Sequence, residues 1–151
     1  MHATQYRELG YQNALTKAGL TYNPELIIKG NFSADSGLSA ANKFADMMPR
    51  PSAIFCMNDK MAIGLIQGLK AKGIKVPEDI SVAGFDDIEF AKYSDPPLTT
   101  IRQPAIELGS CAMALLCDLI EGNVDESTVL QPHFLATDLI VRGSTGVANS
   151  E

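Results

Sequence analysis

Two short apolar runs in the middle of the chain, residues 53–56 and 80–83, each end at a cluster of polar side chains. Between them, residues 59–71 carry apolar side chains at helical spacing. A strand, a helix and a second strand in this order form the βαβ unit of a parallel sheet. Its right-handed crossover brings both strand ends to one edge, where small ligands bind in open α/β sheets. We therefore expect one amide and up to three carboxylates to point into one crevice, namely those of Asn58, Asp59, Asp86 and Asp87.

The same reading of apolar spacing and chain breakers predicts the flanking elements. We expect helices over residues 5–17, 35–48 and 105–121, and a helix or turn over 88–93. Short strands are expected over 26–28 and 98–103, with further strand-like stretches within 129–141. A polar linker is expected over 122–128 and a frayed tail from Gly143. The helix over 105–121 is apolar nearly all round, and such a helix is normally buried on several sides.

Two glycines four residues apart, Gly64 and Gly68, lie within the predicted helix of the βαβ unit, where glycine lowers helix propensity. One explanation is close packing of this helix on the sheet. The other is close approach by a second helix, including one from another subunit.

Composition and charge exclude several classes of protein. The 151 residues carry a net charge of −6, so nothing indicates a nucleic-acid surface. No apolar run approaches the roughly 20 residues of a membrane span, and no signal-peptide core follows the N-terminus. The cysteines, Cys56, Cys111 and Cys117, are expected to be buried free thiols. His2 and His133 are far apart, so a metal site is not expected. No cofactor is expected either.

Catalysis is not expected either. An enzyme could use Asp86 and Asp87 as a magnesium or phospho-acceptor pair, but nothing in the sequence aligns a lysine and a hydroxyl with them. The turn after residues 80–83 has one glycine and lacks the G-x-G-x-x-G pattern of a dinucleotide fold. No Ser/His/Asp set has a supporting motif.

Four segments, RPSAIFCMNDKMAIG, VPEDISVAGFDD, PPLTTIRQP and VRGST, occur in an order that resembles the effector-binding domain of LacI/GalR-type transcriptional regulators. The resemblance covers the chain from about Arg7 to Thr145. Some stretches also look like the cytidine-responsive branch, but they match the general family pattern equally well. Periplasmic sugar-binding transport proteins share the architecture, and they are the alternative, although they rarely carry the last two motifs.

The resemblance implies an α/β fold of the type I periplasmic-binding-protein-like class, with two Rossmann-like lobes and the ligand between them. By this resemblance, residues 1–97 are the C-terminal lobe, residues 98–128 are a crossing strand and a helix of the other lobe, and residues 129–151 are the return strand and tail. Most of the first lobe is then missing, which accounts for a helix that has no polar face.

The family's effector residues correspond here to Arg7, Phe32, Asn58, Asp86 and, least specifically, Gln103. An arginine fork, a carboxylate and an amide suit vicinal hydroxyls or carbonyls, and an aromatic ring can stack on the effector. From the residues alone, each also has an ordinary role. Arg7 could lie on the surface, Phe32 in the core, Asn58 at a helix N-cap, and Asp86 and Asp87 in a turn or cap.

The resemblance also implies the biology. Relatives are cytoplasmic homodimers that bind a sugar, nucleoside or purine and contact operator DNA through an N-terminal helix-turn-helix. That head is not in this sequence, so this chain would supply half of the effector cleft and part of the dimer surface, with Gly64 and Gly68 at the dimer contact. No membrane partner is implied.

Overall fold

A computed structural model describes residues 3–125, 127, 131 and 133–147. It has a four-stranded sheet in the order β1-β2-β3-β4, with three parallel strands and an antiparallel fourth. The strands are β1 (Ala53–Phe55), β2 (Ser81–Asp86), β3 (Thr99–Arg102) and β4 (Asp138–Ile140). The predicted α/β class with a mostly parallel sheet is confirmed.

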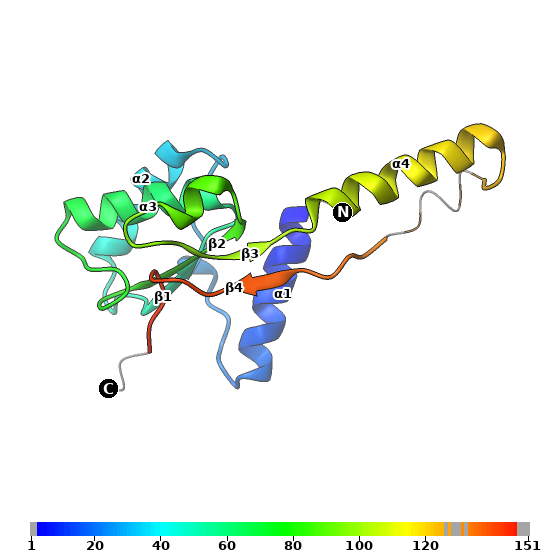
Figure 1. The fold of residues 1–151 in the computed structure, drawn as a ribbon. Helices are drawn as coiled ribbons and strands as arrows, with labels where there is room; N and C mark the ends of the chain where they lie inside the picture. Colours follow the sequence, from blue (N-terminus) through cyan, green and yellow to red (C-terminus); the bar gives the residue numbers. More distant parts are fainter. Residues whose placement is uncertain (1–2, 126, 128–130, 132, 148–151) are drawn as a thin grey trace.

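The predicted βαβ unit forms the centre of the fold (Figure 1). Helix α3 (Asp59–Ala71) connects β1 to β2, and Ala53 pairs with Ser81 in the parallel register. The apolar stripe of α3 packs onto the sheet, because helical spacing places these side chains on one face. The largest apolar side chains below 2% exposure are Leu65, Leu69, Ile80, Val82 and Leu98.

Helix α2 (Ala34–Asp46) covers α3 and explains the two glycines. A Cβ atom at Gly64 would overlap the carbonyl group of Ala34, and one at Gly68 would overlap the side chain of Ala41. Both glycines are buried. The helix that approaches both glycines closely is α2 of the same chain, so internal packing accounts for them. The dimer contact at Gly64 and Gly68 stays a prediction.

The strand expected over residues 26–28 is wrong. Helix α1 (Ala3–Lys17) is followed by a 3₁₀ turn, η1 (Pro24–Leu26), and then by extended chain that joins no ladder among the described strands. An apolar run becomes a strand only where a neighbouring strand accepts its backbone hydrogen bonds. Here an apolar pocket lies between Ile27, Ile28 and β1, so the run has no partner there.

Helix α4 (Ala105–Glu121) forms as predicted, but it projects away from the sheet (Figure 1). None of its residues is buried, and Gly122 ends it in the left-handed conformation. Its exposed side chains include Ile106, Met113, Leu116 and Ile120, at 87, 60, 49 and 76%. The assignment of α4 to another lobe, and the boundaries at 98 and 129, stay predictions.

The remaining turn and linker fit their predictions only in part. Residues 88–93 contain a short 3₁₀ helix, η2 (Glu89–Lys92). The predicted linker over 122–128 and the strand-like region over 129–141 fall partly outside the described residues, at 126, 128–130 and 132. Within that region, β4 is the described strand.

The tail expected to fray from Gly143 is instead bound to the sheet. The hydroxyl of Ser144, which is 0% exposed, donates to Val82 O at 2.6 Å and accepts from Thr99 N at 2.8 Å. Ser144 O accepts from Val82 N at 2.8 Å, and Gly146 N donates to Ser81 Oγ. A small side chain with both a donor and an acceptor satisfies backbone groups between β2 and β3. Residues 148–151 lie outside the described chain.

Candidate functional site

The candidate site is built around the turn that follows β2. Asp86 is the last residue of this strand, at the carboxyl edge of the parallel sheet. Its carboxylate Oδ1 accepts a hydrogen bond of 2.7 Å from Gln103 Nε2, which comes from the chain just after β3. The structure thus brings together Asp86 and Gln103, two of the residues singled out in the sequence.

Helix α1 adds Arg7 to this edge. The guanidinium lies 3.7 Å from the centroid of the Phe85 ring and donates to Met57 O. Burial lowers the pKa of Arg7, and the charge of Asp86 partly offsets this. Burial also raises the pKa of Asp86, opposed by Arg7, Gln103 and Lys60. Arg7 and Asp86 are thus partly desolvated charges that stabilise each other, with donors and acceptors left for a ligand.

Asn58 is the N-cap of α3, and it also reaches the segment of Phe32. Its Oδ1 accepts from Met61 N at 2.9 Å, and its Nδ2 donates to Phe32 O at 3.0 Å. Phe32 has a φ of +65° and its side chain is 45% exposed, so it is not a core residue. The amide of Asn58 fixes the backbone that presents the Phe32 ring, which makes capping its first role.

Asp59 does not point into the crevice, which corrects the expectation for this carboxylate. It is 0% exposed and accepts hydrogen bonds from Thr100 Oγ1 and, at 2.9 Å, from Ile88 N. Burial raises its pKa, while these two hydrogen bonds oppose the rise. A β-strand hydroxyl and a turn amide satisfy this carboxylate inside the protein, so it is not available to a ligand.

Asp87 has a role that the sequence did not indicate. Asp87 lies in the turn after β2, as expected, but the alternative role as a helix cap is wrong, because η2 begins at Glu89 and its N-cap, Ile88, has no side-chain cap. Instead, Asp87 Oδ2 accepts from Arg102 Nε and Oδ1 accepts from Arg142 Nη2, each at 2.7 Å. No pattern in the sequence links these arginines to Asp87, because they come from β3 and from the end of β4, 15 and 55 residues away.

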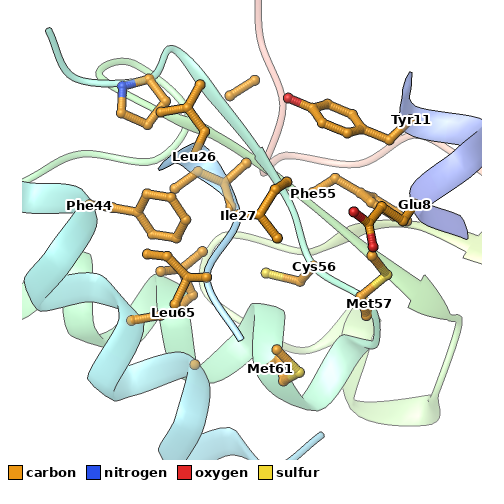
Figure 2. Close-up of a pocket in the computed structure, with 16 residues that line it drawn as sticks. Glu8, Tyr11, Leu26, Ile27, Phe44, Phe55, Cys56, Met57, Met61 and Leu65 are labelled. Atoms are coloured by element: carbon orange, nitrogen blue, oxygen red, sulfur yellow. The ribbon is translucent and has the colours of Figure 1, made fainter. Parts of the chain in front are cut away.

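An apolar pocket lies beside this edge of the sheet and is a separate feature (Figure 2). It is enclosed by the outer side of β1, the chain around Leu26 and Ile27, and the side chains of Phe44 and Leu65. Glu8 and Tyr11 of α1 face it from one side. None of the four side chains of Arg7, Phe32, Asp86 and Gln103 lines it. The polar side chains of Arg7, Asp86 and Gln103 therefore lie near the turn after β2 and not in this pocket.

The cysteines offer no reactive centre at this edge. All three are free thiols, but only Cys56 is buried; Cys111 is half-buried and Cys117 is exposed on α4. Burial, followed by the charge of Asp59, raises the pKa of the Cys56 thiol to about 12. A thiol with this pKa stays protonated near neutral pH and is a poor nucleophile. Within the described ranges, no three His, Cys, Asp or Glu side chains are grouped to hold a metal ion.

The arrangement suits reversible recognition of a small polar molecule. Asp86 supplies acceptor atoms, Arg7 supplies donors, and Phe32 offers an exposed ring next to Asn58. In the part of the chain that the structure describes, no helix has the length and hydropathy to cross a membrane.

Comparison with known families agrees with this geometry. Residues 2–145 match the model of the periplasmic binding protein-like domain. The chain therefore belongs to this family of ligand-binding domains, in the branch found in LacI-family transcriptional regulators.

Particular relatives are repressors. The chain is 42% identical over 147 residues to the HTH-type transcriptional repressor PurR of Vibrio vulnificus. The aligned region covers 97% of this chain and 43% of that repressor. It is 41% identical over 146 residues to the repressor CytR of Escherichia coli K12, covering 96% of this chain and 42% of the relative. The chain thus spans about two fifths of the length of these curated relatives.

Solved structures show the same fold. A complex of the transcriptional regulator CelR with cellobiose superposes with a TM-score of 0.83 at 36% identity, covering 91% of this chain and 41% of that structure. A LacI-family regulator from Lactobacillus casei with bound sucrose gives a TM-score of 0.80 at 29% identity, over 96% of this chain and 52% of the other.

Proposed function

We propose that this chain is the effector-binding and dimerisation part of a LacI/GalR-type transcriptional regulator, and that the effector is a sugar, a nucleoside or a purine. The observation that carries the proposal is the Asp86 carboxylate, partly buried at the ligand edge of a parallel sheet with Gln103 and Arg7 beside it. Effector contacts are assigned to Arg7, Phe32, Asn58, Asp86 and Gln103.

The residue types support a polyhydroxylated ligand. A carboxylate accepts from sugar or ribose hydroxyls, and a guanidinium donates to hydroxyl or carbonyl oxygens. Two regulators of similar structure carry cellobiose and sucrose, which are ligands of this kind. A transport-type sugar-binding protein is the alternative, and the repressors among the relatives favour the regulator.

In the intact regulator, such an effector acts only by binding one arrangement of the lobes better than another. The DNA-binding head is proposed to lie in the part of the protein outside this chain, where the relatives have most of their length. The protein would act in the cytoplasm as a homodimer on operator DNA.

Asp86→Ala in the intact regulator tests the proposal. Calorimetry with ribose, cellobiose, sucrose, cytidine, adenosine and hypoxanthine first finds the compound that binds best. We expect Asp86→Ala to lower affinity for this compound by about 1.5–3 kcal/mol, the value of a hydrogen bond to a charged group, while affinity for operator DNA without effector stays unchanged.

Asp95→Ala is the control for this experiment, because Asp95 is exposed and pairs with Lys70 on the surface. Unchanged effector affinity in Asp86→Ala would contradict the assignment of the site. Binding of a sugar by a protein that lacks any affinity for DNA would favour the transport alternative.

A further inference from the structure

The turn that presents Asp86 has an unfavourable backbone. Asp86 has a φ of +121° and Asp87 a φ of +57°, so two successive residues with side chains lie in a region that favours glycine. Such conformations persist only where the surrounding structure holds them, and they cluster at ligand sites. The turn therefore needs contacts from outside itself.

Asp87 provides two of these contacts. Its carboxylate is 8% exposed and accepts hydrogen bonds of 2.7 Å from Arg102 and from Arg142, one on each oxygen. Hydrogen bonds between ionised groups are short and strong. Burial alone raises the pKa of Asp87, but the hydrogen bonds and charges of the two arginines outweigh it and hold this pKa below its ordinary value.

The two arginines lie on the two chain segments that join α4 to the sheet. Arg102 is the last residue of β3, which leads into α4, and Arg142 follows β4, which returns from it (Figure 1). Arg142 also donates from Nη1 to Leu98 O at 2.8 Å and is only 16% exposed. The Asp87 carboxylate thus connects the end of β2 to the chain segments on either side of α4.

A second carboxylate supports the same turn from the interior. Asp59 accepts from Ile88 N, directly after the turn, and from Thr100 Oγ1 on β3. Together with the bond from Gln103 to Asp86, two successive residues of the turn, Asp86 and Asp87, contact the end of β3 or the residue after it. Ile88 is joined to β3 indirectly, through Asp59 and Thr100. The position of Asp86 is therefore set largely by where β3 and β4 lie.

We propose that Asp87 is a positioning residue, which aims the Asp86 carboxylate at the effector through its ion pairs with Arg102 and Arg142 and joins the effector site mechanically to β3 and β4. The inference rests on the proposed function, because it takes Asp86 as the effector contact. Movement of the turn on effector binding is then transmitted to the two strands that carry α4.

Asp87→Asn in the intact regulator is the main test. Asparagine keeps the shape of the side chain and tolerates the left-handed conformation. The change removes the charge and replaces one of the two acceptor oxygens by a donor, so at least one of the two arginine contacts is lost. With the best-binding compound of the panel of sugars, nucleosides and hypoxanthine, we expect at least a tenfold loss of affinity in Asp87→Asn and in Arg142→Met. The double variant should lose no more than Asp87→Asn alone, because Asp87→Asn already removes the ion pair with Arg142.

Three measurements separate positioning from general destabilisation and from failure of the proposed function. Operator affinity without effector should stay unchanged, and Asp95→Asn, which breaks the exposed pair with Lys70, should leave effector affinity unchanged. If Asp86→Ala loses affinity but Asp87→Asn does not, or if the losses in the double variant add, the positioning role is wrong. If Asp86→Ala also keeps full affinity, the proposed function itself fails.

A test without effector uses hydrogen exchange on this chain. We expect the amide of Ile88 to exchange at least tenfold faster in Asp87→Asn than in Asp95→Asn, while the amide of Leu65 in α3 keeps its rate. Unchanged exchange at Ile88 would overturn the proposal whether or not any compound of the panel binds.

Discussion

At the scale of single residues, Asp59 combines full burial with a pKa that is raised above its ordinary value. Desolvation disfavours the charged form, and the hydrogen bonds from Thr100 and Ile88 only partly compensate. The folded protein therefore holds this proton more tightly than the unfolded chain does. Its contribution favours the folded state below the ordinary aspartate pKa of about 4 and is lost as pH rises through the raised folded value.

We expect Asp59→Asn to reduce this pH dependence. The free energy of unfolding of the unmodified chain should fall more steeply with rising pH above about 4 than that of the variant, because asparagine has no proton to release. Urea denaturation between pH 4 and 7 measures the two slopes. Asp46→Asn, at an exposed position, should keep the slope of the unmodified chain. Equal slopes in Asp59→Asn and the unmodified chain would contradict the explanation.

At the scale of elements, small residues set how closely α2 and α3 approach. Gly37 and Gly64 each face backbone of the other helix, and Gly68 faces Ala41 and Leu38. The loss of helix propensity at these glycines is thus compensated by close packing of two helices over one face of the sheet.

Gly64→Ala and Gly109→Ala should shift stability in opposite directions. A methyl group at Gly64 overlaps the backbone of Ala34, and overpacking of this kind costs about 1–3 kcal/mol. A methyl group at Gly109 in α4 meets no atom within 4 Å, so the substitution should stabilise by up to about 1 kcal/mol through helix propensity. Chemical denaturation of both variants measures the difference. If Gly64→Ala keeps its stability but weakens the dimer, the result would instead support a subunit contact at Gly64.

At the scale of the whole molecule, α4 leaves apolar side chains in solvent. Burying a Leu, Ile or Met side chain stabilises a protein by about 1.5–3 kcal/mol, and exposed apolar patches of this kind usually mark a contact. In the structure, α4 does not fold back onto the sheet. A second copy of the chain is therefore the partner we expect when this chain is expressed alone.

Light scattering should find the isolated chain as a dimer or larger assembly, joined partly through Ile106, Met113, Leu116 and Ile120. Met113→Gln combined with Leu116→Gln should shift it toward monomer, whereas Ser110→Gln on the same helix should not. A stable monomer that binds no hydrophobic dye would show that α4 is covered within its own chain, and the prediction would be wrong.

The sequence predictions were accurate where an element depends on residues within or next to it, and wrong where it depends on distant partners. Helix 105–121 was predicted with the bounds that α4 has, because the apolar spacing lies within the segment and Pro104 and Gly122 flank it directly. The strand over 26–28 was wrong because a strand depends on a neighbour that its own residues do not specify. The tail from Gly143 was wrong for the same reason, since Ser144 is ordered by backbone groups of Val82 and Thr99.

The βαβ unit and the position of Asp86 at its carboxyl edge follow from the amino-acid sequence, because apolar periodicity and the handedness of the crossover depend on neighbouring residues. The use of each carboxylate at that edge follows from the folded structure. It buries Asp59 against Thr100, pairs Asp87 with Arg102 and Arg142, and leaves Asp86 beside Arg7. The three carboxylates differ in burial and in their partners. These partners lie up to 79 residues away in the chain, and only folding brings them together.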